Sequence, residues 1–312
     1  MKRLRNDRGS VLVMVVLMFT GLMAIGGITL DVGSWYTAKR KLQSTADAAA
    51  LAAAQDLPNT TTAGQSATSY ANLNNSGLNS WTPSFPNTYT IDISLSKSAP
   101  SYFSSLVGVS GKTVHAHSRA LVGTPTQLNN VLPVAVNVNV ACKTDSTGCF
   151  NLAKTLTFDD STTVSFSSSS WGLMDPSGQN TSTTTCQGQA SESNLASWVT
   201  TGYPGTLSTG TYDGAVNGQK QAIQNALNTQ IGKVLLIPVF DTASQSWCQN
   251  PAKGGFHVVG WAAFVIDQSI PNSDWTAHVK KLHGHFTTYL AHSVPYTPGY
   301  NGFGVKVVAL NQ

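Results

Sequence analysis

The stretch VLVMVVLMFTGLMAIGGITL, residues 11–30, contains no ionisable side chain. A bilayer core about 30 Å thick is crossed by about 20 apolar residues in a helix, at about 1.5 Å of rise each. Hydrocarbon offers no hydrogen-bond partners, so the backbone must satisfy its own donors and acceptors within a helix. The stretch therefore predicts a transmembrane helix over residues 10–31, with a short tail on one side and the bulk of the chain on the other.

The tail over residues 1–9 is basic and predicts the orientation of this helix. It carries four basic residues against one acidic residue, namely Lys2, Arg3, Arg5, Arg8 and Asp7. Basic residues beside a span stay on the cytoplasmic side. We therefore expect a single-pass protein of the cytoplasmic membrane, with a cytoplasmic N-terminus and the C-terminal bulk outside the cytoplasm.

A cleaved signal peptide is the alternative interpretation of the same segment. Signal peptides have an apolar core of about 7–15 residues followed by a small-x-small cleavage site. The run here is longer, and its best such site, Ala24–Gly26, lies inside it. We therefore expect the segment to be retained as an anchor.

The composition of the remaining chain indicates a nearly neutral exported protein. Its formal charge of +4 falls to +1 when the first eight residues are left out, and only 10% of the residues are charged. Such a surface has no basic stripe for phosphates, so we expect no nucleic-acid binding. Because 41% of the residues are hydrophobic, the chain has enough apolar material for a core. We expect an α+β protein, in which the long N-terminal helix extends outside the membrane and a β-rich exported region with a few helices follows.

Four cysteines favour two disulfides in an exported domain. Sequence allows three pairings, and we favour Cys142 with Cys149 and Cys186 with Cys248. A zinc site is the competing interpretation, but the chain has no C-x-x-C pair.

The helix is expected to continue beyond the membrane as an alanine-rich extension over residues 32–57. Residues 46–54 read ADAAALAAA, which are strong helix formers, and Pro58 ends the pattern. Small residues at helical spacing allow two helices to approach closely, although glycine is common in spanning helices in any case. The candidates for helix packing with partner proteins are Thr20, Ala24, Gly27, Leu42, Ala46, Ala49 and Ala53. At the exit from the membrane we expect Asp31 to be solvated by interfacial water.

Two further regions are expected after this helix. Residues 58–125 predict a small α/β unit, with helices at 63–74 and 100–108 and strands at 88–95 and 112–122. The last strand alternates between a small-residue face and a polar face that bears His115, His117 and Arg119. Residues 126–312 predict a β-rich exported domain, with strands at 233–240, 256–267 and 303–310 and a helix at 214–230.

The order of features over residues 8–57 is distinctive. It consists of Arg8-Gly9, the apolar run, the tetrapeptide Leu30–Gly33, the basic segment Lys39–Gln43 and the alanine run Ala46–Ala54. This order resembles the N-terminal module of the TadE/TadG-like proteins of bacterial tight-adherence (Flp) pilus assembly. The resemblance implies a bitopic bacterial envelope protein that assists assembly, anchoring or export of a pilus, without enzymatic activity. It implies membrane lipid and other pilus-assembly or envelope proteins as partners through the N-terminal helix, and it allows a homo-oligomer.

The sequence departs from that family in two places. Many TadG-like proteins carry a von Willebrand A domain with a D-x-S-x-S metal motif, whereas Asp241 is followed by Ala243 and Gln245. Prepilins have a glutamate five residues after the processed glycine, and the place counted from Gly9 holds Met14. We therefore expect no metal site at Asp241 and no processing by a prepilin peptidase.

The late histidines carry the competing functional hypothesis, a membrane-tethered metal hydrolase. They are His257, His278, His283, His285 and His292. Two of them, His283 and His285, would share one side of a strand, with Asp274 nearby in sequence, which is a weak zinc pattern. A secreted adhesin is a third hypothesis. We expect a non-enzymatic protein with no cofactor and no metal.

Overall fold

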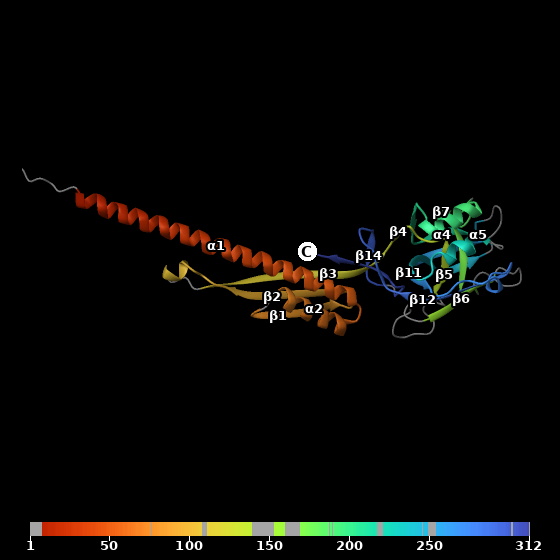
Figure 1. The fold of residues 1–312 in the computed structure, drawn as a ribbon, viewed down its shortest axis with the longest axis horizontal. Helices are drawn as coiled ribbons and strands as arrows, with labels where there is room; N and C mark the ends of the chain where they lie inside the picture. The colour runs from red at the N-terminus through yellow and green to blue at the C-terminus, as the bar shows by residue number, and fades with distance from the viewer. Residues whose placement is uncertain are drawn as a thin grey trace, which may run out of the picture. The chain divides into compact units, whose positions relative to one another are not determined.

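A computed structural model describes residues 8–75, 77–107, 111–138, 153–159, 169–186, 188, 190–216, 221–244, 246–248, 254–300 and 302–311. The chain forms two compact units. The first comprises Met1–Leu121 and Ala309–Gln312, and the second comprises Val122–Val308. The expected α+β class is confirmed, since a long apolar N-terminal helix is followed by a strand-rich region with a few helices (Figure 1).

The first unit is built on α1 (Arg8–Asp56), a single helix of 49 residues (Figure 1). At about 1.5 Å of rise per residue it is about 74 Å long. We call its residues 11–30 the stem. The helix ends before Pro58, which lacks the N–H needed to continue it. The second helix, α2 (Thr60–Asn74), begins at once, capped by the Asn59 side chain, which accepts a hydrogen bond from the Thr62 N–H at 3.2 Å.

Alanines on both helices allow α1 and α2 to pack closely. The alanines of α2 that are essentially unexposed, Ala63, Ala67 and Ala71, recur every four residues and so lie on one face. Ala46, Ala49 and Ala53 of α1 are equally buried. The spacing that suggested a contact with another protein is thus used inside the chain.

An antiparallel sheet completes the first unit, with β1 (Ser80–Asn87), β2 (Thr90–Ala99) and β3 (Lys112–Pro125) paired in that order. The apolar side chains of β2 and the small-residue face of β3 are buried, as the alternation in β3 predicts. The strand β1 was not expected because it contains Pro83 and Pro86. Proline is tolerated in a strand at the edge of a sheet, and β1 is such a strand.

Five strands of the second unit pair in a closed ring. The order is β10 (Val234–Ser244), β5 (Val134–Asn137), β7 (Trp171–Asn180), β9 (Thr211–Val216) and β11 (Gly255–Ile266), and β11 pairs again with β10. Closure gives every strand of the ring two neighbours and so protects its edges. The strands β12 (Val279–Thr287) and β6 (Ala153–Asp159) extend the sheet from β11.

The core of the second unit is aromatic. Its largest unexposed side chains are those of Trp171, Trp261, Trp275, Phe240, Phe256, Phe264 and Phe286. The remaining elements are short: α4 (Glu192–Thr201), α5 (Gln221–Asn228), β4 (Gln127–Asn129), β8 (Thr206–Ser208), η3 (Asn272–Asp274), β13 (Tyr289–Leu290), β14 (Tyr296–Pro298) and β15 (Val305–Leu310).

Two predicted helices are corrected by the structure. Among the described residues of the helix expected over residues 214–230, α5 is helical, whereas Gly214 belongs to β9 and pairs with both Asp175 and Gly255. The helix expected over residues 100–108 is a single 3-10 turn, η1 (Ser104–Val107). At residues 214–216, strand pairing overrides a local composition that suggested a helix.

Candidate functional site at the end of the apolar stem

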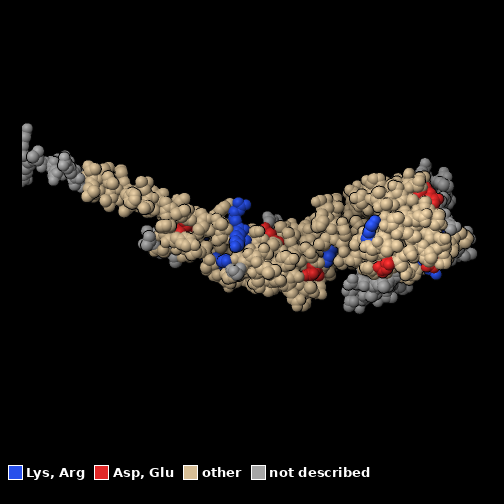
Figure 2. All heavy atoms as spheres, in the orientation of Figure 1, with Lys and Arg blue, Asp and Glu red and all other residues tan. Residues whose placement is uncertain are grey.

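The stem is exposed on nearly every side. Each of its large apolar side chains is between 49% and 69% exposed. Figure 2 shows no charged side chain on its visible face. By length and composition α1 is able to cross a membrane, and the most apolar part of it is only 6% buried within the chain. The stem is therefore the part of the first unit that needs a surrounding other than water or its own fold.

Asp31, the first residue after the stem, is fully enclosed by the connection between β2 and β3. Its carboxylate accepts hydrogen bonds from the backbone N–H groups of Tyr102 at 2.8 Å, Phe103 at 3.0 Å and Ser104 at 2.6 Å. The Ser104 hydroxyl donates a fourth, at 2.5 Å. Asp31 is 0% exposed, so the expectation that interfacial water solvates it is wrong. Backbone donors from a segment 71 residues away solvate it instead.

The same connection contacts α1 on both sides of Asp31. On the stem side, Phe103 lies against Gly27, where a Cβ atom would come within 2.6 Å of the Phe103 Cβ. A side chain at position 27 would therefore displace the aromatic ring. On the other side, the Trp35 indole N–H donates to the Pro100 carbonyl oxygen at 3.2 Å.

Basic and aromatic side chains follow on α1. The Arg40 guanidinium lies 5.7 Å from the centre of the Tyr36 ring, a cation–π distance. A groove between α1 and β3 is lined in part by Trp35, Lys39 and Lys112. Figure 2 shows Lys and Arg side chains gathered next to the stem. Aromatic and basic residues in this order beside an apolar helix are typical of a membrane surface.

The candidates for helix packing divide into two groups. Leu42, Ala46, Ala49 and Ala53 are 0% exposed within the first unit. Within this unit α1 packs against α2 and β2, so the chain itself covers these four side chains. Thr20 and Ala24 lie on the exposed stem, whereas Gly27 is covered by Phe103.

Comparison with known proteins bears on this same helix. Residues 9–56 match a family model described as putative Flp pilus-assembly TadE/G-like. The N-terminal helix is TadE/G-like. The resemblance seen in the sequence is thereby confirmed for α1. No curated protein and no solved structure matches the chain.

Beyond the TadE/G-like helix, three of the late histidines pair with separate aspartates. His283 Nε2 lies 3.3 Å from Asp274 Oδ2, and His285 Nδ1 lies 2.8 Å from Asp267 Oδ1. The two imidazoles share the half-exposed face of β12, as their spacing predicts. Their carboxylate partners differ, so the pair does not converge on one point.

The candidate metal site at Asp241 also contains a single histidine–aspartate pair. His257 Nδ1 lies 2.8 Å from Oδ1 of Asp241, the residue considered for a von Willebrand-type metal motif. In the described part of the chain, no three or more His, Cys, Asp or Glu residues are grouped to hold a metal ion. This geometry does not favour the hydrolase hypothesis.

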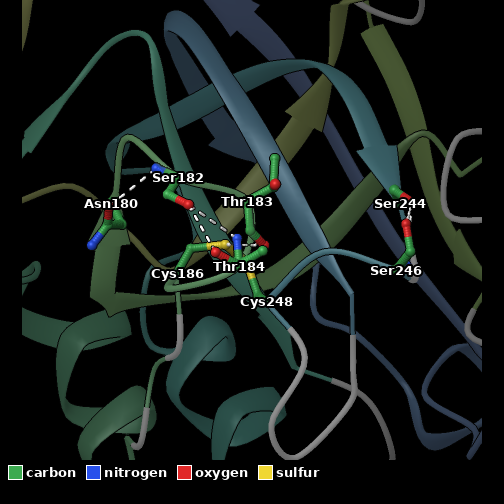
Figure 3. The surroundings of a disulfide bond; sticks show 8 residues. All are labelled: Asn180, Ser182, Thr183, Thr184, Cys186, Ser244, Ser246 and Cys248. Atoms are coloured by element: carbon green, nitrogen blue, oxygen red, sulfur yellow. Dashed lines mark hydrogen bonds between the residues drawn. A yellow bond between two sulfur atoms is a disulfide. The ribbon is translucent and has the colours of Figure 1, made fainter.

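A disulfide links Cys186 and Cys248, which are 62 residues apart in sequence (Figure 3). It joins the segment after β7 to the segment after β10, and the Cys248 backbone N–H donates to the Thr183 carbonyl oxygen at 2.7 Å. Cys142 and Cys149, the other expected pair, lie outside the described residues.

Sequence reasoning missed a buried acidic pair in the second unit, Asp175 and Asp213. Asp175 accepts hydrogen bonds from the Ser177 N–H and hydroxyl and from the Ala190 N–H. Asp213 is 0% exposed, and neither of its carboxylate oxygens has a hydrogen-bond partner among the described atoms. Burial, followed by the charge of Asp175, raises the pKa of Asp213 well above its usual range.

The Thr211 hydroxyl has a small opposite effect on the pKa of Asp213. The Thr211 hydroxyl donates its hydrogen bond to the Ser208 carbonyl oxygen, 2.7 Å away. No sequence signal marks this aspartate, because a short strand with the letters TYDGAV also fits an exposed edge.

Proposed function

We propose that the protein is a bitopic envelope protein that assists assembly, anchoring or export of a Tad/Flp-type pilus. It acts by helix packing and protein–protein contact rather than by catalysis. The observation that carries the proposal is the division of the TadE/G-like helix. Its stem is exposed and apolar, whereas from Leu42 onward one face of the same helix is buried in the folded first unit.

The physical mechanism is that of a rigid tether. A helix without a break between stem and unit transmits a displacement in the membrane directly to the folded part. Hydrogen bonds between Asp31 and the β2–β3 connection support α1 directly after the stem. Contacts with other membrane helices then fall to the stem, where Thr20 and Ala24 form the small-residue face that remains open.

The proposed location is the bacterial cytoplasmic membrane, with the basic tail in the cytoplasm and both units outside. The four basic residues before the stem support this orientation. The Cys186–Cys248 disulfide also supports it, because disulfides persist outside the reducing cytoplasm.

The proposal is tested in the bacterium that carries the gene. A strain without the gene should make markedly fewer pili, counted by electron microscopy, and the wild-type gene should restore them. A double variant, Thr20→Leu with Ala24→Leu, should stay in carbonate-washed membranes but fail to restore piliation, because larger side chains keep partner helices apart.

The matched control is Met18→Leu with Ile25→Leu, which conserves size on other faces of the stem and should restore piliation fully. Normal piliation in the strain without the gene would overturn the proposed function. Full restoration by the Thr20 and Ala24 variant would overturn only the proposed contact face.

A further inference from the structure

The connection between β2 and β3 reaches back along α1 to the level of the stem (Figure 1). Phe103 covers Gly27, which precedes the last stem residue, Leu30, by three positions. At about 1.5 Å of rise per residue, this contact lies about 5 Å inside the end of the stem. If the stem fills the hydrocarbon core, Phe103 lies below its outer boundary.

The composition of this connection suits such a position. Residues 98–111 contain no Asp, Glu, Lys, Arg or His, and Lys112 stands at their end. Tyr102 is 64% exposed and Phe103 is 46% exposed, so two aromatic rings face outward at the tip. Aromatic side chains are enriched where a membrane protein meets the headgroup region.

Hydrogen bonding removes the main obstacle to burial in lipid. A carboxylate at the edge of hydrocarbon is costly, and so are unpaired backbone N–H groups. Here Asp31 and the N–H groups of residues 102–104 satisfy one another. Neither partner then requires water, and the loop can follow the helix into the bilayer surface.

We propose that the tip of the β2–β3 connection, Pro100–Val107, enters the outer leaflet beside α1 and is a second lipid-contacting element. Asp31 is its positioning residue, holding the tip through its backbone donors. The occupant of the exposed Tyr102 and Phe103 surface is bilayer lipid at the boundary between headgroups and acyl chains. This inference rests on the proposed membrane anchoring by the stem.

The test places a nitroxide label at single cysteines of the full chain in nanodiscs of phosphatidylcholine and phosphatidylglycerol. Cys142 and Cys149 are replaced by serine, and the Cys186–Cys248 disulfide is retained. The labelled variants are Tyr102→Cys at the tip, Leu22→Cys in the stem and Tyr89→Cys at the β1–β2 turn, the opposite end of β2. Collisions with oxygen report lipid, and collisions with a water-soluble nickel chelate report water.

We expect the labels at positions 102 and 22 to collide mainly with oxygen, and the label at position 89 to collide mainly with nickel. A label at position 102 that behaves like position 89, while position 22 remains in lipid, overturns the loop proposal alone. A water-exposed label at position 22 overturns the anchoring proposal and, with it, this inference.

The positioning role of Asp31 is tested by measuring the same collision rates for the label at position 102 in a second set of variants. Asp31→Ala should raise the collision rate with nickel several-fold, because the backbone N–H groups of the tip lose their carboxylate acceptor. Asp47→Asn is the matched control, an acidic position of α1 that contacts Gln43 within the folded unit and should leave the rate unchanged. An equal response to the two substitutions, or none to either, overturns the role assigned to Asp31.

Discussion

The two units place their acidic side chains in opposite environments. In the first unit, Asp92 is paired across the sheet with Arg119, whose Nε and Nη2 groups donate to it at 2.5 and 2.7 Å. In the second unit, Asp213 is buried, and its carboxylate oxygens have no hydrogen-bond partner among the described residues. The hydrogen bond from Arg119, and then its charge, outweigh burial and lower the pKa of Asp92. Burial and the negative charge of Asp175 raise the pKa of Asp213. The units should therefore respond to pH with opposite signs.

The largest expected effect is the loss of stability of the second unit when its disulfide is removed. Cys186→Ser with Cys248→Ser frees a loop of 62 residues, which in the chain-entropy account costs about 4 kcal/mol of unfolding free energy. Unit-resolved hydrogen exchange should show this loss in β7, β9 and β11 and no change in α2 or β2. An equal loss in both units would contradict the division into independent structures.

A second prediction uses the raised pKa of Asp213. The folded state keeps the proton at pH values where the unfolded chain has released it, so stability should fall as the pH rises from about 4 toward the folded pKa. Asp213→Asn imitates the protonated side chain and should remove this loss, so that the variant is more stable than wild type at neutral pH.

Urea unfolding followed by tryptophan fluorescence measures the Asp213 effect, because five of the seven tryptophans lie in the second unit. The control is Asp241→Asn, at an aspartate that is partly exposed and paired with His257. Parallel pH profiles for wild type and Asp213→Asn would show that the buried carboxyl does not titrate with folding.

The smallest effect concerns Asp92, whose pKa is lowered by Arg119. Its stabilising contribution is complete above about pH 4 and is lost as the pH falls through the folded pKa. Asp92→Asn should slightly weaken the first unit at neutral pH and leave it unchanged in acid, measured by protease resistance of β2 and β3. The effect is small because the Arg119 side chain is 43% exposed and solvent screens the pair. A larger loss in acid than at neutral pH would reverse the predicted sign.

How far the sequence predicts the fold also differs between the units. The stem, the alanine-rich half of α1 and the alternation of β3 follow from local periodicity, which one segment reveals by itself. The strand β9 and the ring that includes it depend on partners far along the chain, and their glycines and alanines carry little local preference.

The same limit applies to the site. Helical spacing identified Ala46, Ala49 and Ala53 as a packing face but not its partner, which is the chain's own α2. Asp31 was recognised as a charge at the end of the stem. Its donors come from Tyr102–Ser104, and only the folded sheet brings them to it.

The central claim is that the stem stays attached to both units and embedded in lipid. N-terminal sequencing of the protein recovered from carbonate-washed membranes tests it most directly. We predict a sequence that begins before Val11, so that the whole stem is present. A mature protein that begins after Gly26 and is released into the wash would contradict the account.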